Sequence, residues 1–290
     1  MSVSTPPSFR TEPFHISAVL GKSVKIYLDL FVVFVVIALI FLLPGAVTQF
    51  AFGAWPAPVS PKPGAAPDLT GVWASLLINV LLQIVGGSTL ILLSFQKLNG
   101  EAGDVGAAFR RALSRFFPVL GIFLLVWLFI VIGIAVGIVV GMAFYLARSH
   151  FTPTVSAEAF SMIGFALAFV LASVLLIILA CMFSVATQAS LAESLGPWAS
   201  MQRSRKLSKG ERWRIFGLLL IAFLPMFVLV FASTSNGAGI VSPTALSLGG
   251  LVVNLLWMPF SAAFSAVLFH DLRLAKESAD KRVTEQLLAS

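Results

Sequence analysis

The sequence predicts an all-α, polytopic integral membrane protein with six transmembrane helices. Three observations predict this class: the composition, six long apolar runs, and the uneven distribution of Lys and Arg between those runs. Hydrophobic residues make up 59% of the 290 residues, charged residues only 11%, and the mean hydropathy is +1.00. Such a chain lacks the polar surface needed to cover a soluble core, so a bilayer is its expected solvent.

The apolar runs predict the spans. A spanning helix needs about 20 mostly apolar residues, because about 30 Å of hydrocarbon is crossed at about 1.5 Å per residue. The first run is too long and too far from the N-terminus for a signal-peptide core, so we expect it to be retained. The predicted domains are a flexible N-terminal tail (1–15), a membrane domain (16–275) and a C-terminal cytoplasmic tail (276–290). The six predicted spans are 27–52, 72–95, 118–146, 160–187, 215–231 and 246–269.

The basic residues predict the orientation. Of the 19 Lys and Arg residues, 17 lie in the two terminal tails and in the second and fourth connections, and only Lys62 and Arg148 lie on the opposite side. By the positive-inside rule, we expect a multi-pass protein with both termini in the cytoplasm. This asymmetry also explains the net charge of +7, and no zinc-ligand spacing or aromatic platform indicates nucleic acid as a partner.

Three similar segments indicate an internal repeat. The stretches "SAVLGKSVKIYLDLFVVFVV", "GAAFRRALSRFFPVLGIFLLV" and "ASMQRSRKLSKGERWRIFGLLLI" lie roughly 90 residues apart, and each is a basic segment running into a span. They predict three copies of a cytoplasmic interfacial helix followed by a transmembrane hairpin. The middle copy, 105–116, is the most amphipathic, with an apolar face at Val105, Ala108, Phe109, Ala112, Leu113 and Phe116. The first copy repeats this face weakly through Ile16, Leu20, Val24 and Tyr27, and the third, about 197–207, through Trp198 and Met201.

The most basic stretch, "RSRKLSKGERWRIFG", precedes the fifth span. Ser208 and Glu211 have the spacing of a capping box, which predicts that they cap the start of that span. The flanking cations then fall at the level of lipid headgroups, where a tryptophan ring is also favoured. The predicted contacts to lipid headgroups or to a partner, here and in the middle copy, are Arg110, Arg111, Arg115, Arg203, Arg205, Lys206, Lys209, Arg212, Trp213 and Arg214.

Several residues inside the spans have a predicted packing role. Gly133, Gly137 and Gly141 recur every four residues, which favours close helix packing within the bundle or between subunits. Asp29 lies near the start of the first span, four residues after Lys25, with which it can pair. Polar residues are scarce, and they can form interhelical hydrogen bonds or line a polar path: Asn79, Gln83, Gln188 and Asn254. The single cysteine, Cys181, is expected to be a small packing residue.

Two motifs in the last third of the chain resemble a known family. In "RSRKLSKGERWRIFGLLLI", Lys209, Gly210, Trp213 and Arg214 match the basic turn of the membrane domain associated with bacterial glycerophosphoryl diester phosphodiesterases. The stretch "WMPFSAAFSAVLFHDLRLAKES" is similar to the final helix of that family and its D-L-R exit. It departs at Ser278, where the family often has Gly, and a usual Tyr before the D-L-R is replaced by Phe269 or His270. The resemblance implies a membrane domain only, since the separate catalytic barrel is not present.

The sequence does not indicate an enzyme. His15, His150 and His270 lie in regions that do not converge easily, and no catalytic, metal-binding or cofactor-binding site is predicted. The expected function is a non-enzymatic scaffold or accessory membrane domain that contacts anionic inner-leaflet lipid, or a partner, through its basic cytoplasmic helices. That partner would be another membrane protein or a second copy of the chain. The alternative is a small-solute or lipid transporter, or permease, that uses the interior of the bundle.

Overall fold

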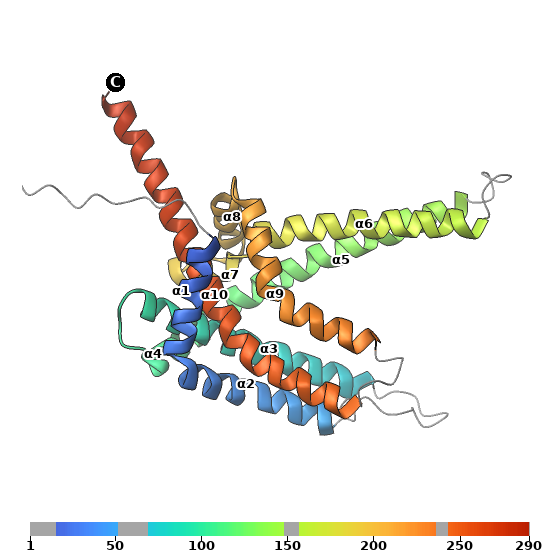
Figure 1. The fold of residues 1–290 in the computed structure, drawn as a ribbon, viewed down its shortest axis with the longest axis horizontal. Helices are drawn as coiled ribbons and strands as arrows, with labels where there is room; N and C mark the ends of the chain where they lie inside the picture. The colour runs from blue at the N-terminus through green and yellow to red at the C-terminus, as the bar shows by residue number, and fades with distance from the viewer. Residues whose placement is uncertain (1–15, 52–68, 148–156, 236–242, 290) are drawn as a thin grey trace, which may run out of the picture. The chain divides into compact units, whose positions relative to one another are not determined.

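The computed structural model describes residues 16–51, 69–147, 157–235 and 243–289, and every element in these ranges is a helix (Figure 1). The all-helical class is therefore confirmed for the part of the chain that is described. The chain divides into two compact units, Met1–Phe116 with Leu218–Ser290 and Phe117–Gly217, and each is described by itself. The predicted N-terminal tail, 1–15, lies outside the described residues.

The first unit contains α1 (Ile16–Asp29), α2 (Phe31–Ala51), α3 (Leu69–Leu98), α4 (Val105–Ser114), most of α9 (Arg212–Ser235) and α10 (Pro243–Ala289). The α3 helix packs against α2, α4 and α10, and α1 packs along α10. Leu90, Leu93 and Phe269 are fully or almost fully buried in this core, and the rings of Phe95 and Phe269 meet edge to face with centroids 5.8 Å apart. Large apolar side chains on α3 and α10 thus build the centre of the unit.

A bend at Leu30 separates α1 from α2. The two helices meet at an angle of 79°. The first predicted span, 27–52, therefore does not run as one helix from Tyr27, because α1 ends at Asp29 and α2 begins at Phe31. No glycine or proline marks this break, and Asp29, the charged residue beside it, was assigned to the first span.

The second unit contains α5 (Phe116–Ala147), α6 (Ala157–Phe183), α7 (Ala186–Glu193), α8 (Pro197–Ser208) and the start of α9. In Figure 1, α5 and α6 run side by side as a hairpin. The short helices α7 and α8 pack against each other, and α8 also packs against α6. A small core joins Ile122, Ala186 and Met201, and the stacked rings of Phe129 and Phe183 cover it.

Four helical segments are long and apolar enough to cross a membrane: Leu76–Leu98, Phe116–Leu146, Met162–Glu193 and Leu248–Ser278. The bent pair Ile16–Asp29 and Phe31–Val47 passes the same test together, which raises the number to five. Over its described residues, α9 is not among them, so six spans remain a prediction, as does the threefold repeat. The α10 helix continues through most of the predicted C-terminal tail and ends at Ala289.

Candidate functional site

The basic segment before the fifth predicted span folds as the end of α8, a tight turn and the start of α9. Gly210 occupies the turn with a φ of +93°, a backbone conformation that is accessible to glycine but costly for other residues. Ser208 is the last residue of α8, so its hydroxyl donates back to the Arg205 carbonyl at 3.2 Å. The predicted capping box of Ser208 and Glu211 is therefore wrong. The Glu211 carboxylate instead accepts from Arg214 at 3.0 Å.

Arg203 is held inside the protein by an acidic side chain. Its Nε and Nη2 atoms donate to both carboxylate oxygens of Glu193 at 2.9–3.1 Å, which links α8 to α7. Both side chains are largely buried, at 28% and 19% exposure. Such a two-pronged pair has the fork geometry that guanidinium groups prefer. Arg203 thus has a structural role in α8, which the sequence analysis did not anticipate.

The other predicted contacts of this segment lie at the surface. Trp213 is 85% exposed, with its ring edge to face against Phe216 at a centroid distance of 6.2 Å. An exposed indole of this size is unusual in water and favoured at a membrane interface. The exposed cations around it are Arg205, Lys206, Lys209, Arg212 and Arg214.

The buried face of α8 differs from the predicted one. Met201 is buried, but Trp198 is 60% exposed, so the two residues do not share the predicted face. The face that packs against α6 and α7 consists mainly of small residues: Ser200, Ser204 and Ser208, with Met201 and Leu207. Ser204 donates to the Met182 carbonyl at 2.8 Å and accepts from the Val185 N–H at 3.4 Å. Its hydroxyl thereby ties α8 to the break between α6 and α7.

The α4 helix carries the other predicted basic residues, and its first turn is capped and fixed to α3. Asp104 caps its first turn by accepting from the Ala107 N–H at 3.0 Å. The side-chain carbonyl of Gln96, at the end of α3, accepts from the Asp104 N–H at 2.9 Å, so the start of α4 is fixed to α3. Ala108 and Ala112 form the buried face.

The predicted apolar face of α4 is divided between the core and the surface. Only its two alanines are buried, and Val105, Phe109 and Leu113 are 39%, 39% and 55% exposed. These three residues follow one another at intervals of four, so they form one stripe along the helix. Arg110 and Arg111 are exposed beside them, whereas Arg115 and Phe116 are half-buried.

The α1 helix packs through a face that the sequence analysis did not choose. Val19, Ser23 and Ile26 are buried, and the predicted apolar stripe at Ile16, Leu20, Val24 and Tyr27 is half-buried or exposed. Two ion pairs hold α1 in place. Lys22 donates to Asp271 of α10, and Asp29 lies 3.2 Å from Lys97 of α3. The predicted pairing of Asp29 with Lys25 is therefore wrong, because Lys97 is brought close by the α1–α3 contact.

The glycine stripe of α5 lies against α6. A Cβ atom would lie 3.4 Å from the Ala172 Cβ at Gly137 and 3.5 Å from the Leu176 side chain at Gly133, whereas at Gly141 it would lie 2.8 Å from the Phe165 ring, too close to fit without a shift. These are the contacts expected for packing within the chain.

The scarce polar residues do not gather in one unit. Asn79, Gln83 and Asn254 belong to the first unit, where Gln83 is exposed and the other two are half-buried. Gln188 belongs to the second unit, and its buried side-chain oxygen has no hydrogen-bond partner. Cys181 is buried in α6.

The described residues include no group of three or more His, Cys, Asp or Glu side chains that could hold a metal ion. His15 and His150 lie outside these residues, and His270 contacts its neighbour Asp271 at 3.3 Å. Comparisons of the chain with models of protein families, with curated proteins and with solved structures find no match. The arrangement of exposed cations and exposed apolar side chains is therefore the main guide to function.

Proposed function

We propose that this protein is a non-enzymatic membrane scaffold or accessory domain that binds anionic lipid headgroups through α4 and through the basic segment 203–214. The observation that carries the proposal is the surface of α4, where the apolar stripe Val105, Phe109 and Leu113 is exposed beside Arg110 and Arg111. A helix with this division can place its apolar side chains at the acyl boundary while the guanidinium groups meet phosphates.

The basic segment supports the same proposal by an independent feature. The exposed Trp213 ring is next to the exposed cations Arg212 and Arg214. Indole rings favour the headgroup region, and each basic residue near an anionic leaflet contributes about 1 kcal/mol. Arg203 is not part of this surface, because Glu193 binds it.

The proposal includes the orientation. With six spans, both termini and both basic segments lie on the cytoplasmic side of a bacterial inner membrane, and the 17 basic residues on one side support this orientation. The motif resemblance in the last third of the chain fits this proposal, because it is a resemblance to a membrane domain without its catalytic barrel.

The experiment neutralises two adjacent cations and measures bound lipid. Arg205→Gln with Lys206→Gln removes two exposed charges of α8. We expect the ratio of phosphatidylglycerol to phosphatidylethanolamine that copurifies with the protein, measured by mass spectrometry, to fall severalfold. The expected loss is about 2 kcal/mol of headgroup attraction.

The matched control is Lys281→Gln with Arg282→Gln, another adjacent basic pair. It lies 12 residues beyond the last predicted span, or about 18 Å along a helix. This control should retain the parent ratio. At 1 M salt, where the Debye length is about 3 Å, the two variants should converge. An unchanged ratio in the α8 variant at low salt would contradict the proposal.

A further inference from the structure

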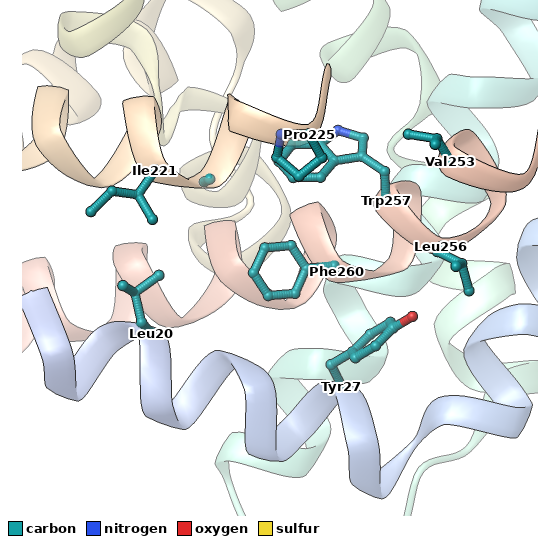
Figure 2. Close-up of a pocket in the computed structure, with 9 residues that line it drawn as sticks. Leu20, Tyr27, Ile221, Pro225, Val253, Leu256, Trp257 and Phe260 are labelled. Carbon is teal, nitrogen blue, oxygen red and sulfur yellow. The ribbon is translucent and has the colours of Figure 1, made fainter. Parts of the chain in front are cut away.

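The first unit contains an apolar pocket of about 400 Å³ between α1, α9 and α10 (Figure 2). This volume lies within the range of known small-molecule sites, about 300–1,000 Å³. None of its lining side chains is charged, and the polar groups among them are the Tyr27 hydroxyl and the Trp257 indole N–H. We propose that the pocket binds one acyl chain of a membrane phospholipid.

The α1 wall of the pocket is apolar surface that the core leaves uncovered. Leu20 and Tyr27 line the pocket, and Val24, which lies between them on the same stripe, is 42% exposed. The core face of α1 is formed by other residues. The stripe therefore provides apolar surface that continues along α1 beyond the pocket.

The α10 wall is built from aromatic rings that hold one another in place. Trp257 contacts Phe260 with ring centroids 5.7 Å apart, and Phe260 meets Tyr27 edge to face at 5.9 Å. On the other side, Trp257 contacts Phe223 of α9 at 5.2 Å. In Figure 2 the Phe260 ring lies between the α1 and α9 walls. Rings packed in this way have few alternative rotamers, so the walls are formed before a ligand enters.

The α9 wall includes a proline. Pro225 lacks the N–H that would donate to the Ile221 carbonyl four residues earlier, so α9 has one backbone hydrogen bond fewer at this level. Ile221, Ala222 and Pro225 all line the pocket. The Ala222 side chain is small, so it leaves space in this wall for a ligand.

The occupant follows from the medium. The α10 wall belongs to Leu248–Ser278, which is apolar enough to cross a membrane, so acyl chains are the most abundant apolar molecules beside the pocket. This inference goes beyond the proposed function, which concerns headgroups at α4 and at the segment 203–214.

The test uses Trp257 as a reporter of the pocket. The other five tryptophans, Trp55, Trp73, Trp127, Trp198 and Trp213, are replaced by Phe, and detergent-solubilised protein is titrated with phosphatidylglycerol that carries brominated acyl chains. Bromine quenches a tryptophan that it contacts. We expect saturable quenching of Trp257, with half of the effect at a lipid fraction at least tenfold below that needed for a reporter that retains only the exposed Trp127.

A second set of variants fills the pocket with a larger side chain. Ala222→Phe should raise the half-quenching fraction about tenfold, whereas Leu224→Phe, on an exposed position of α9, should leave it unchanged. Quenching of Trp257 that follows Trp127 at every lipid fraction would overturn the proposal even if Ala222→Phe did not fold. Arg205 and Lys206 do not line the pocket, so the two experiments are independent. If Trp257 showed no saturable quenching but the α8 variant lowered the lipid ratio, the pocket proposal would be wrong and the proposed function would still hold.

Discussion

The Lys22 ammonium lies 2.9 Å from both carboxylate oxygens of Asp271, so one ion pair joins the first described helix to the last across 249 positions of sequence. The Asp271 side chain is only 12% exposed, and it also contacts the His270 ring at 3.3 Å. Removal of the cation would leave a partly buried carboxylate with a weaker partner. The pair therefore fixes α1 along α10 and helps to shape the apolar pocket.

Loss of this pair should destabilise the first unit. We expect Lys22→Gln to lower the free energy of unfolding in detergent by about 1–2 kcal/mol, because the buried oxygens of Asp271 lose a charged donor. Lys22→Asp combined with Asp271→Lys should recover part of that loss. The control is Glu277→Gln, which breaks an exposed pair within α10 and should cost about 0.5 kcal/mol or less. Equal melting temperatures for Lys22→Gln and the parent would show that other contacts hold α1.

Removal of the Ser204 hydroxyl should lower the free energy of unfolding more than removal of the Ser200 hydroxyl on the same face of α8. Ser204→Ala removes the bonds to Met182 and Val185 that tie α8 to the break after α6, so we expect a loss of about 1–3 kcal/mol. Ser200→Ala removes a bond to the Gly196 carbonyl in the same helix turn, and it should cost less. Both hydroxyl groups belong to fully buried residues, so burial is matched. Thermal unfolding of the two variants measures the difference, and a larger loss for Ser200→Ala would argue against the bridging role of Ser204.

Alanine substitutions at two adjacent glycines of α3 should change the stability of the protein in opposite directions. A Cβ atom at Gly86 would lie 2.7 Å from the Phe41 ring of α2 and 3.0 Å from Met258 of α10, so Gly86→Ala forces these helices apart and should cost about 1–3 kcal/mol. A Cβ atom at Gly87 meets no atom within 4 Å, and Gly87→Ala should stabilise the helix by up to about 1 kcal/mol. The melting temperatures should therefore move in opposite directions. A gain from Gly86→Ala would mean that the three helices are not closely packed there.

Reporter fusions test the six-span topology. Fusions after Gly100, Ser208 and Ser290 should be cytoplasmic, and fusions near Lys62, Phe151 and Gly237 should be external, because 17 of the 19 Lys and Arg residues lie on the side of the first set. The Gly237 fusion is decisive, since it follows α9, the helix that is not among the candidate spans over the described residues. A cytoplasmic signal at Gly237 would show that α9 does not cross the membrane.

Long-range periodicity accounted for most of the helices but not for their contacts. Apolar runs of 20 or more residues predicted α3, α5 and α6 to within a few residues at most ends, because burial in hydrocarbon demands continuous hydrophobicity. The bend at Leu30 was missed, because no glycine or proline marks it and Asp29, the charged residue beside it, was assigned to the first span. The capping box was misread because the turn at Gly210 leaves Ser208 inside the preceding helix.

For the functional surface too, the sequence predicted which residues lie on a helix face but not which residues they contact. Composition and spacing were enough to place cations and apolar residues on α4 and on the segment 203–214, because a helical period assigns residues to faces. The partners of those residues depend on which helices meet, and spacing along one helix carries no information about a second helix. Only the tertiary structure therefore decided that Glu193 removes Arg203 from the surface, that Asp29 binds Lys97, and that the apolar stripe of α1 borders a pocket while Val19, Ser23 and Ile26 enter the core.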